Sequence, residues 1–237
     1  LFGYMQAGSF PKVFLFAGPK GTGKTSASRI LGALFNDPAN ADAVDHDFFG
    51  STSKTKQISY VEPDKNSKQN HLIFTGQSYI VTELDAASNR GIDDVLALKE
   101  RVTPPPQEGK VSVYILDEAH MLTTEAFNAL LKLLEEPPAH VVFILATTEL
   151  HKIPATILSR TTIVPFQKAS ISELVTSLSS ILRQVKLAAK DTVLEEIAAR
   201  AGGSFRDAVK YLEQVATQTQ ASGKKELEKE DVAHYLH

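Results

Sequence analysis

The sequence lacks several features that would assign it to particular classes of protein. It contains no cysteine, which excludes disulfide bonds and thiolate metal sites and is compatible with a reducing compartment. No apolar run approaches the length of a membrane span. The first residues, LFGYMQAGSF, lack the basic start and long apolar stretch of a signal peptide. We therefore expect a protein without disulfides that does not enter a membrane.

The sequence also lacks a strong excess of either charge. Its 25 Lys and Arg residues against 28 Asp and Glu residues give a net charge of -3. This balance argues against a generally basic nucleic-acid-binding domain and leaves a local basic face open. The apolar content of 43% is ordinary for a soluble globular protein. A length of 237 residues fits one large domain or two small ones.

Short apolar runs alternate with segments of helical periodicity over the first two thirds of the chain. Strands are predicted at 13–17, 79–84, 111–116, 141–146 and 163–166, and helices at 25–34, 91–102 and 124–134. This alternation indicates a parallel sheet covered on both faces. We expect the polar segment 36–76 to be an irregular surface excursion, with a short hairpin as an alternative.

Strand signals stop after Phe166. Ser170 followed three residues later by Glu173 is a capping box, which marks the start of a helix. Apolar spacing predicts helices at 171–186, 191–201, 205–218 and 230–236. We therefore predict an α/β domain over residues 1–167 and a small all-α domain over residues 168–237.

The stretch FAGPKGTGKTSASRIL carries the clearest chemical signal. The phosphate-binding pattern G-x-x-x-x-G-K-[ST] is matched by Gly18, Pro19, Lys20, Gly21, Thr22, Gly23, Lys24 and Thr25. The backbone N–H groups of such a loop and the start of the following helix attract phosphate oxygens. Lys24 would then reach the terminal phosphates and Thr25 would coordinate Mg²⁺. Ser26 is assigned to the same nucleotide site. The alternative is a glycine-rich turn that matches by chance.

A second acidic motif, VYILDEAH, follows an apolar strand. Asp117 stands where a nucleoside triphosphatase needs the acid that supports Mg²⁺. Glu118 follows it and is positioned to polarise the attacking water. The alternative for this pair is a helix N-cap with an exposed acid. We expect His120 to be structural.

Longer stretches identify a family. HMLTTEAFNALLKLLEEPPAHVVFILATT, ILSRT and ELDAASNRGIDDV closely resemble the clamp-loader branch of the AAA+ ATPases, and within it the gamma/tau subunits of bacterial DNA polymerase III. The resemblance covers roughly residues 12–35 and 78–237. It implies an AAA+ P-loop core with a parallel five-stranded sheet, followed by a small all-α lid domain.

The resemblance also implies roles for single residues. Thr148, with Thr147 as the fallback, would contact the terminal phosphate or the attacking water. Arg160 would be an arginine finger acting in trans on a neighbouring subunit, and Arg206 would couple the lid to the nucleotide. Simpler alternatives are polar residues at a strand end, a surface arginine paired with an acid, and an ion pair of Arg206 with Asp207.

The implied function is that of an ATPase subunit that opens a sliding clamp and places it on primed DNA. The implied cofactors are ATP and Mg²⁺, and the implied partners are further gamma/tau copies, delta, delta-prime, the clamp and primed DNA. DNA would be held through its backbone. Candidate DNA contacts, or simply a solvated face, are Arg90, Lys99, Arg101 and Lys110. The resemblance implies a location in the bacterial cytoplasm.

Three departures from the family pattern leave alternatives open. The usual four-cysteine zinc module is replaced by the cysteine-free segment 36–76, so no zinc is expected. The usual SRC motif reads Ser159-Arg160-Thr161. Both ends look short, which suggests a fragment or a shortened family member. The competing functions are a non-hydrolysing, delta-prime-like stator, which the intact Lys24 argues against, and another AAA+ motor such as a branch-migration helicase.

Overall fold

The computed structural model describes residues 10–50, 60–224 and 226–235. Their contacts divide the chain into two compact units. The first is an α/β unit that ends at Pro165, and the second is a mainly helical unit that begins at Phe166. The loop Gly18–Gly23 groups by its contacts with the helical unit, although the residues on either side of it belong to the α/β unit.

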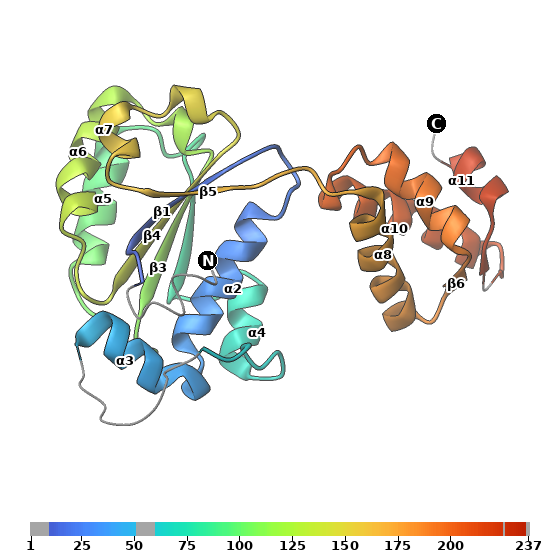
Figure 1. The fold of residues 1–237 in the computed structure, drawn as a ribbon, viewed down its shortest axis with the longest axis horizontal. Coiled ribbons are helices and arrows are strands. Elements are labelled where there is room, and N and C mark those ends of the chain that lie inside the picture. Colours follow the sequence, from blue (N-terminus) through green and yellow to red (C-terminus); the bar gives the residue numbers. More distant parts are fainter. Residues whose placement is uncertain (1–9, 51–59, 225, 236–237) are drawn as a thin grey trace. The chain divides into compact units, whose positions relative to one another are not determined.

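The α/β unit is built on a five-stranded sheet in which all neighbouring strands run parallel. The strand order is β2-β3-β4-β1-β5 (Figure 1). The bounds are β1 Val13–Ala17, β2 Val81–Asp85, β3 Ser112–Asp117, β4 Val141–Thr147 and β5 Thr162–Pro165. The five strands and the parallel sheet are therefore confirmed, with shifts of one or two residues at their ends. Every residue of β1 and β4 is buried, as expected for central strands covered on both faces.

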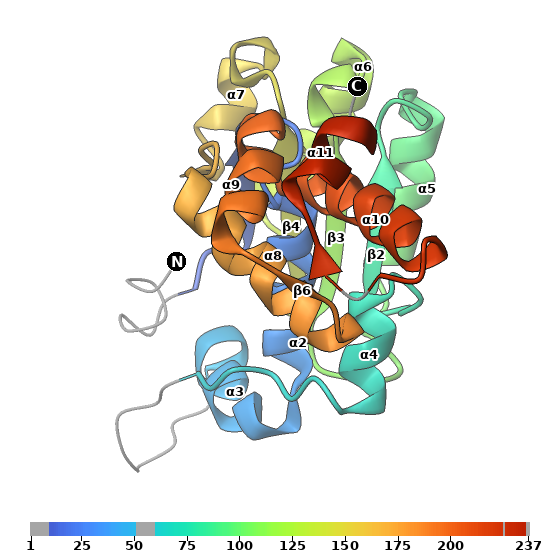
Figure 2. The same ribbon diagram turned by 90° about the vertical axis from the view of Figure 1, so that its right-hand side faces the viewer.

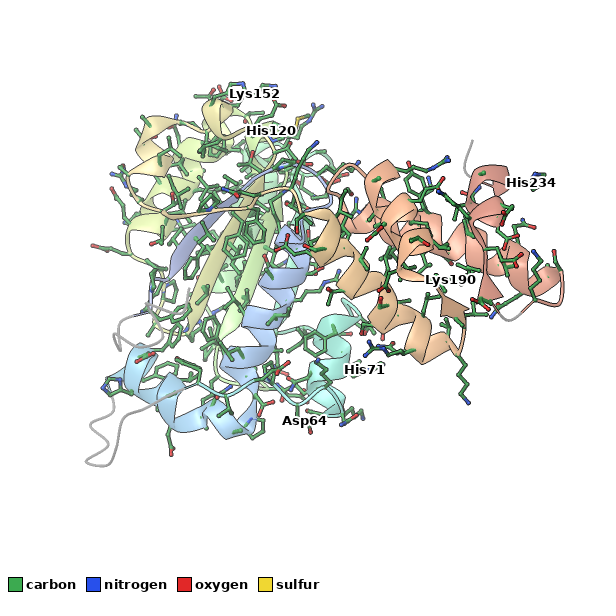
Figure 3. The ribbon with its side chains drawn as sticks, turned by 45° about the vertical axis from the view of Figure 1, so that its right-hand side comes forward. Asp64, His71, His120, Lys152, Lys190 and His234 are labelled. Atoms are coloured by element: carbon green, nitrogen blue, oxygen red, sulfur yellow. The ribbon has the colours of Figure 1, made fainter. Side chains whose placement is uncertain are left out.

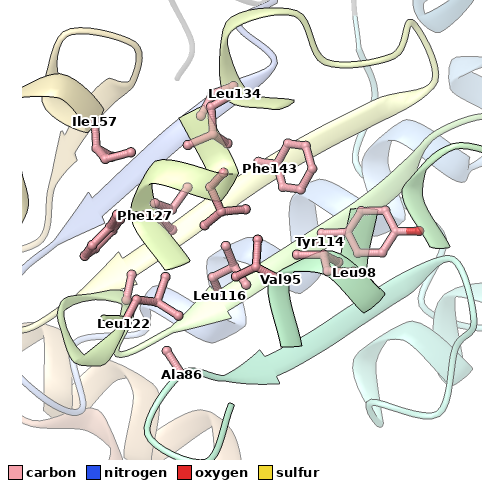
Figure 4. Packing of buried hydrophobic residues seen from close by; sticks show 14 of the residues in the cluster. Ala86, Val95, Leu98, Tyr114, Leu116, Leu122, Phe127, Leu134, Phe143 and Ile157 are labelled. Carbon is pink, nitrogen blue, oxygen red and sulfur yellow. The ribbon is translucent and has the colours of Figure 1, made fainter. Parts of the chain in front are cut away.

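One face of the sheet is covered by α5 Ile92–Val102, α6 Thr124–Glu135 and the short α7 Ala155–Leu158 (Figure 1). Phe127, Leu130 and Leu134 of α6 lie on the buried side of that helix. They pack in one cluster with Phe143 and other strand residues (Figure 4). The Thr123 hydroxyl caps α6 by accepting a hydrogen bond from the Ala126 N–H. The predicted amphipathic helix over 124–134 is thus confirmed.

The helix α2 Lys24–Asn36 covers the other face of the sheet. Gly32 allows it to lie close to β2, because a Cβ atom at this position would come within 2.5 Å of a Val81 methyl group. The absence of a side chain at this one helical position therefore lets the helix pack directly on the edge strand.

The expectation of an irregular excursion over 36–76 is wrong for the described part of that segment. It contains the 3-10 helix η1 Pro38–Asn40 and the helices α3 Ala41–Phe49 and α4 Lys68–Phe74. Its described residues contain no strand, so they offer no support for a hairpin. Residues 51–59, where the rest of the excursion falls, lie outside the described residues.

Polar residues that suggested a surface loop are in fact buried in this segment. Asn40 and Asn70 are at most 1% exposed. Asn40 donates to the Leu34 and Val61 carbonyls, and its own amide oxygen accepts from the Val61 N–H. Amide side chains thus satisfy backbone groups that no regular element satisfies, which lets an irregular path pack compactly.

The helical unit contains α8 Ile171–Val185, α9 Asp191–Arg200, α10 Phe205–Ala221 and α11 Lys229–Tyr235 (Figure 2). The Ser170–Glu173 capping box is confirmed, because the Glu173 N–H donates to Ser170 Oγ and the Ser170 N–H donates to the Glu173 carboxylate. The unit is not purely helical, since β6 Ala188–Ala189 pairs with β7 Glu226–Leu227. Within the described ranges, no helix is both long and apolar enough to cross a membrane.

Candidate nucleotide site

Three strands end at the same edge of the sheet and bring the predicted site residues of the α/β unit together. Asp117 is the last residue of β3, and Thr147 is the last residue of β4. The register pairs Thr147 with Ala17, the last residue of β1. Because all three strands are parallel, the segments that follow them leave the sheet at one edge, where open α/β sheets bind their ligands.

Thr25 and Asp117 meet at this edge. Thr25 Oγ1 donates to Asp117 Oδ2 over 3.3 Å. Lys24 begins α2 and is only 7% exposed. Ser26 is exposed and lines a groove between α2 and α4. The structure therefore brings Thr25 to the acid and leaves the Ser26 side chain on the helix surface.

This pair fits a Mg²⁺ ion that arrives with a nucleotide. A hydroxyl and a carboxylate are hard oxygen donors, and Mg²⁺ is usually held by one or two protein groups together with waters and substrate phosphates. Among the described residues, no group of three or more His, Cys, Asp and Glu side chains could hold a metal ion by itself. The donor set therefore suits a metal–nucleotide complex better than a resident metal.

Glu118 has an unusual backbone conformation beside this pair. Its φ of 48° and ψ of 44° lie in the left-handed region, which is uncommon for a residue other than glycine. Its N–H donates to Asp117 Oδ1 over 2.9 Å, and its carboxylate accepts from Thr148 Oγ1 over 3.0 Å. Such outliers cluster at functional sites, where the surrounding contacts hold them in place.

Thr147, the last residue of β4, and Thr148, which follows it, have different surroundings. Thr148 faces Glu118, as described above. Thr147 is fully buried, its Oγ1 lies 3.0 Å from His120 Nδ1, and it accepts a hydrogen bond from the Glu149 N–H. Thr148 is thus the one that reaches Glu118. No sequence motif pointed to Glu149, whose carboxylate lies 3.3 Å from His120 Nε2.

The phosphate-binding loop has the backbone that its glycines suggested. Gly21 and Gly23 have φ values of 75° and 93°, which residues with a Cβ rarely adopt. The Gly21 carbonyl accepts from the Phe205 N–H at the start of α10 over 2.9 Å. A Cβ atom on Gly21 would lie 3.4 Å from the Arg206 Cβ. The structure therefore places Arg206 beside the loop.

The remaining loop residues lie close to the same helix start. Thr22 is buried and its hydroxyl donates to the Pro19 carbonyl over 2.9 Å, which closes the turn. Pro19 and Lys20 line a cavity of about 340 Å³ whose other walls include Lys168 and Ser204. This cavity is lined entirely by residues of the helical unit and the loop.

Arg160 lies on the surface of the α/β unit. Its guanidinium pairs with the Glu135 carboxylate at the end of α6, and its Nη1 donates to the Thr156 carbonyl over 2.6 Å. About a third of the side chain is exposed. Lys110, one of the candidate DNA contacts, is similarly engaged, because its ammonium lies 2.5 Å from the Asp45 carboxylate. Ion pairs of this kind also form between surface residues that contact neither a nucleotide nor DNA, so both pairings fit that simpler alternative as well.

Comparison with known proteins identifies relatives of this chain. The sequence matches a family model described as DNA polymerase III, delta subunit, over residues 1–170. It is 40% identical over 206 residues to the tau subunit of DNA polymerase III from Bacillus subtilis, covering 86% of this chain and 33% of that protein. It is 33% identical over 210 residues to the tau subunit from Escherichia coli, covering 89% and 30%. The chain spans about a third of the length of these relatives.

Solved structures show the fold. The RuvB Holliday junction branch migration motor of Thermotoga maritima superposes with a TM-score of 0.67 at 17% identity, covering 100% of this chain and 64% of that one. At this identity the likeness shows an AAA+ fold and no shared activity. The expected resemblance to gamma/tau subunits is also confirmed, since a gamma/tau subunit from Mycobacterium tuberculosis is 37% identical over 211 residues, 89% of this chain and 34% of that protein. The chain therefore belongs to the DNA polymerase III delta-subunit family and has the AAA+ ATPase fold.

Proposed function

We propose that this chain is an ATPase subunit of a DNA sliding-clamp loader. The observation that supports it most strongly is the pair of contacts at the ends of β3 and β4, where Thr25 meets Asp117 and Thr148 meets Glu118. A metal-binding pair next to a water-activating pair is the minimum a P-loop ATPase needs. The similarity to tau and gamma/tau subunits of DNA polymerase III supports the clamp-loader context.

In this proposal each residue at the sheet edge has a separate task. Thr25 and Asp117 hold Mg²⁺, and Lys24 neutralises the terminal phosphates. Glu118 accepts a hydrogen bond from the attacking water and draws off its proton. Thr148 holds the Glu118 carboxylate in place through the observed hydrogen bond. ATP supplies the free energy, and the protein positions the water and the phosphates.

Two arginines would link ATP hydrolysis to the helical unit and to a neighbouring subunit. Arg206, beside the phosphate-binding loop, would report nucleotide occupancy to the helical unit. Arg160 would exchange Glu135 for the ATP of a neighbouring subunit, where a finger supplied in trans is worth roughly 10³–10⁵ in rate. The partners would be further gamma/tau copies, delta, delta-prime, the clamp and primed DNA, all in the bacterial cytoplasm.

The first test is a titration of fluorescent ATP and GTP analogues in the presence of Mg²⁺. We expect the ATP analogue to bind with preference, and Lys24→Ala to remove binding because the phosphates lose their main cation. Lys132→Ala, which changes an exposed lysine on α6, is the matched control and should bind as the unmutated chain does. Absence of binding to the unmutated chain would contradict the ATPase proposal and favour the stator alternative.

A further inference from the structure

A buried histidine lies between two carboxylates next to the proposed site. The His120 side chain is only 7% exposed. Its Nδ1 lies 3.0 Å from Thr147 Oγ1 and 3.5 Å from Glu118 Oε2, and its Nε2 lies 3.3 Å from Glu149 Oε1. Figure 3 labels His120 together with Lys152, whose ammonium also contacts Glu149. The imidazole ring therefore connects Glu118 to an acid that no family motif assigned.

Glu149 is held as an ionised acceptor. Lys152 Nζ donates to its carboxylate over 2.9 Å, and this hydrogen bond lowers the pKa of Glu149 below its ordinary value. An ionised carboxylate can only accept hydrogen bonds. The ring nitrogen that faces it, His120 Nε2, therefore carries a proton. The partner at one ring nitrogen determines which of the two nitrogens carries the proton. With the proton on Nε2 beside Glu149, the unprotonated Nδ1 is the nitrogen that points to the site.

Thr147 closes the arrangement into a ring of contacts. Its hydroxyl oxygen accepts from the Glu149 N–H over 3.0 Å. The hydroxyl proton is then free to go to His120 Nδ1, and the Glu149 carboxylate lies 3.3 Å from His120 Nε2 on the other side of the imidazole ring. Thr147, His120 and Glu149 thus contact one another in a ring, which limits the movement of each. The end of β4 and the turn after β3 are thereby fixed to each other.

We propose that His120 and Glu149 are positioning residues for Glu118. His120 Nδ1 packs against Glu118 Oε2 at 3.5 Å, and Thr148, the residue after β4, donates a hydrogen bond to the same Oε2 atom. The carboxylate is left with one oxygen, Oε1, available for the attacking water. This assignment deepens the proposed ATPase function and rests on it.

The positioning role makes a different prediction from a structural one. A histidine that only fills the core would affect stability, and its loss would lower binding and turnover together. A positioning residue acts on the orientation of Glu118 alone. Misplacing a catalytic group by about 1 Å costs about 10²-fold in rate and leaves ground-state binding unchanged.

Substitutions can separate the two halves of the contact ring. In His120→Asn the amide oxygen can stand near the position of Nδ1 and accept from Thr147, and the contact with Glu149 is lost. In His120→Gln the amide nitrogen stands near Nε2 and the contacts with Thr147 and Glu118 are lost. Glu149→Gln keeps the shape and removes the charge. His140→Gln is the matched control, because His140 lies before the opposite end of β4 and faces the Val102 carbonyl.

The experiment measures ATP turnover at saturating ATP, the dissociation constant for a fluorescent ATP analogue, and the melting temperature. We expect turnover to fall by about 10- to 10²-fold in His120→Gln and Glu149→Gln, with the dissociation constant within about twofold of the unmutated chain. His140→Gln should keep full turnover. Unchanged turnover in both test variants, or equal losses of binding and turnover, would overturn the positioning role.

Two further measurements separate this inference from the proposed function. Glu118→Gln gives the baseline of the assay, and an unmutated chain no more active than this baseline would overturn the ATPase proposal itself. A ¹⁵N histidine spectrum needs no nucleotide. We expect the neutral His120 ring to carry its proton on Nε2, and Glu149→Gln to disturb that preference. A proton on Nδ1 in the unmutated chain would contradict the contact ring even if ATP is hydrolysed.

Discussion

Glu118 holds the most strained backbone position of the site. Only two described residues other than glycine have a positive φ, and Glu118 is one of them. A side chain in the left-handed region costs about 1–2 kcal/mol. The hydrogen bonds from the Glu118 N–H to Asp117 and from Thr148 to the Glu118 carboxylate offset part of that cost. The strained turn brings the carboxylate back beside the end of β4.

A pair of substitutions measures this strain. We expect Glu118→Gly to be more stable than Glu118→Ala by about 1 kcal/mol, because both lack the carboxylate but only glycine adopts a positive φ without strain. This order is the reverse of the one found in ordinary helices and strands. Urea unfolding of the two variants gives the difference directly. An alanine variant of equal or higher stability would mean that the turn relaxes to negative φ.

The chemistry of single residues was predictable to different degrees. Lys24, Thr25, Asp117 and Glu118 belong to patterns of consecutive residues, and such patterns can be recognised from sequence alone. Glu149 has no such pattern. Its contact with His120 depends on the turn after β4, which the Glu149 N–H itself stabilises by donating to Thr147. Contacts made across the sheet edge need the register of the strands, and the sequence does not specify it.

At the scale of elements, the segment 36–76 shows how composition can mislead. Its many Asn, Asp, Ser and Lys residues suggested a solvated loop, whereas the strands with continuous apolar runs were predicted to within two residues. The error arose because Asp37 and Asn70 are used as internal hydrogen-bonding groups. Aromatic packing adds to this, since the rings of Phe35 and Phe48 lie 5.2 Å apart. Neither contact is visible in local periodicity.

Asp37 provides a test of this explanation. Its carboxylate is 5% exposed and accepts hydrogen bonds from the Ala39 N–H, the Asp64 N–H and Asn70 Nδ2 at 2.7–2.9 Å. We expect Asp37→Asn to lower the free energy of unfolding by about 1–3 kcal/mol at pH 7, because the new amide group faces donors. Urea unfolding measures this, with Asp42→Asn, an exposed acid in α3, as the control.

The same carboxylate makes stability depend on pH. Burial alone would raise the pKa of Asp37, but the three hydrogen bonds outweigh it and hold the pKa below the ordinary 3.8. The unfolded chain therefore binds the proton more readily, and the stabilisation is present above pH 3.8 and is lost as the pH falls through the lower folded value. The stability difference between the unmutated chain and Asp37→Asn should shrink as the pH falls below about 3.8. A constant difference would show that ionisation of Asp37 is not the cause.

At the scale of the whole molecule, we propose that the site needs Arg160 from a second chain. Arg160 is engaged with Glu135 on the surface of its own α/β unit. A finger that acts on a neighbour must leave this pair, and an exposed pair of this kind contributes only about 0–1 kcal/mol. Assembly can therefore redirect Arg160 at small cost. Turnover should then rise with the concentration of the chain.

Mixing two inactive variants tests whether Arg160 works in trans. Arg160→Ala keeps its own Glu118 and lacks the finger, whereas Glu118→Gln keeps the finger and lacks the base. In a head-to-tail assembly the Glu118→Gln chain can supply Arg160 to its neighbour, so random pairing should restore about a quarter of the unmutated turnover. Glu135→Gln, which frees Arg160 without removing it, should stay active. A mixture no more active than its two components would mean that Arg160 belongs to the surface of its own chain, as its pairing with Glu135 alone would suggest.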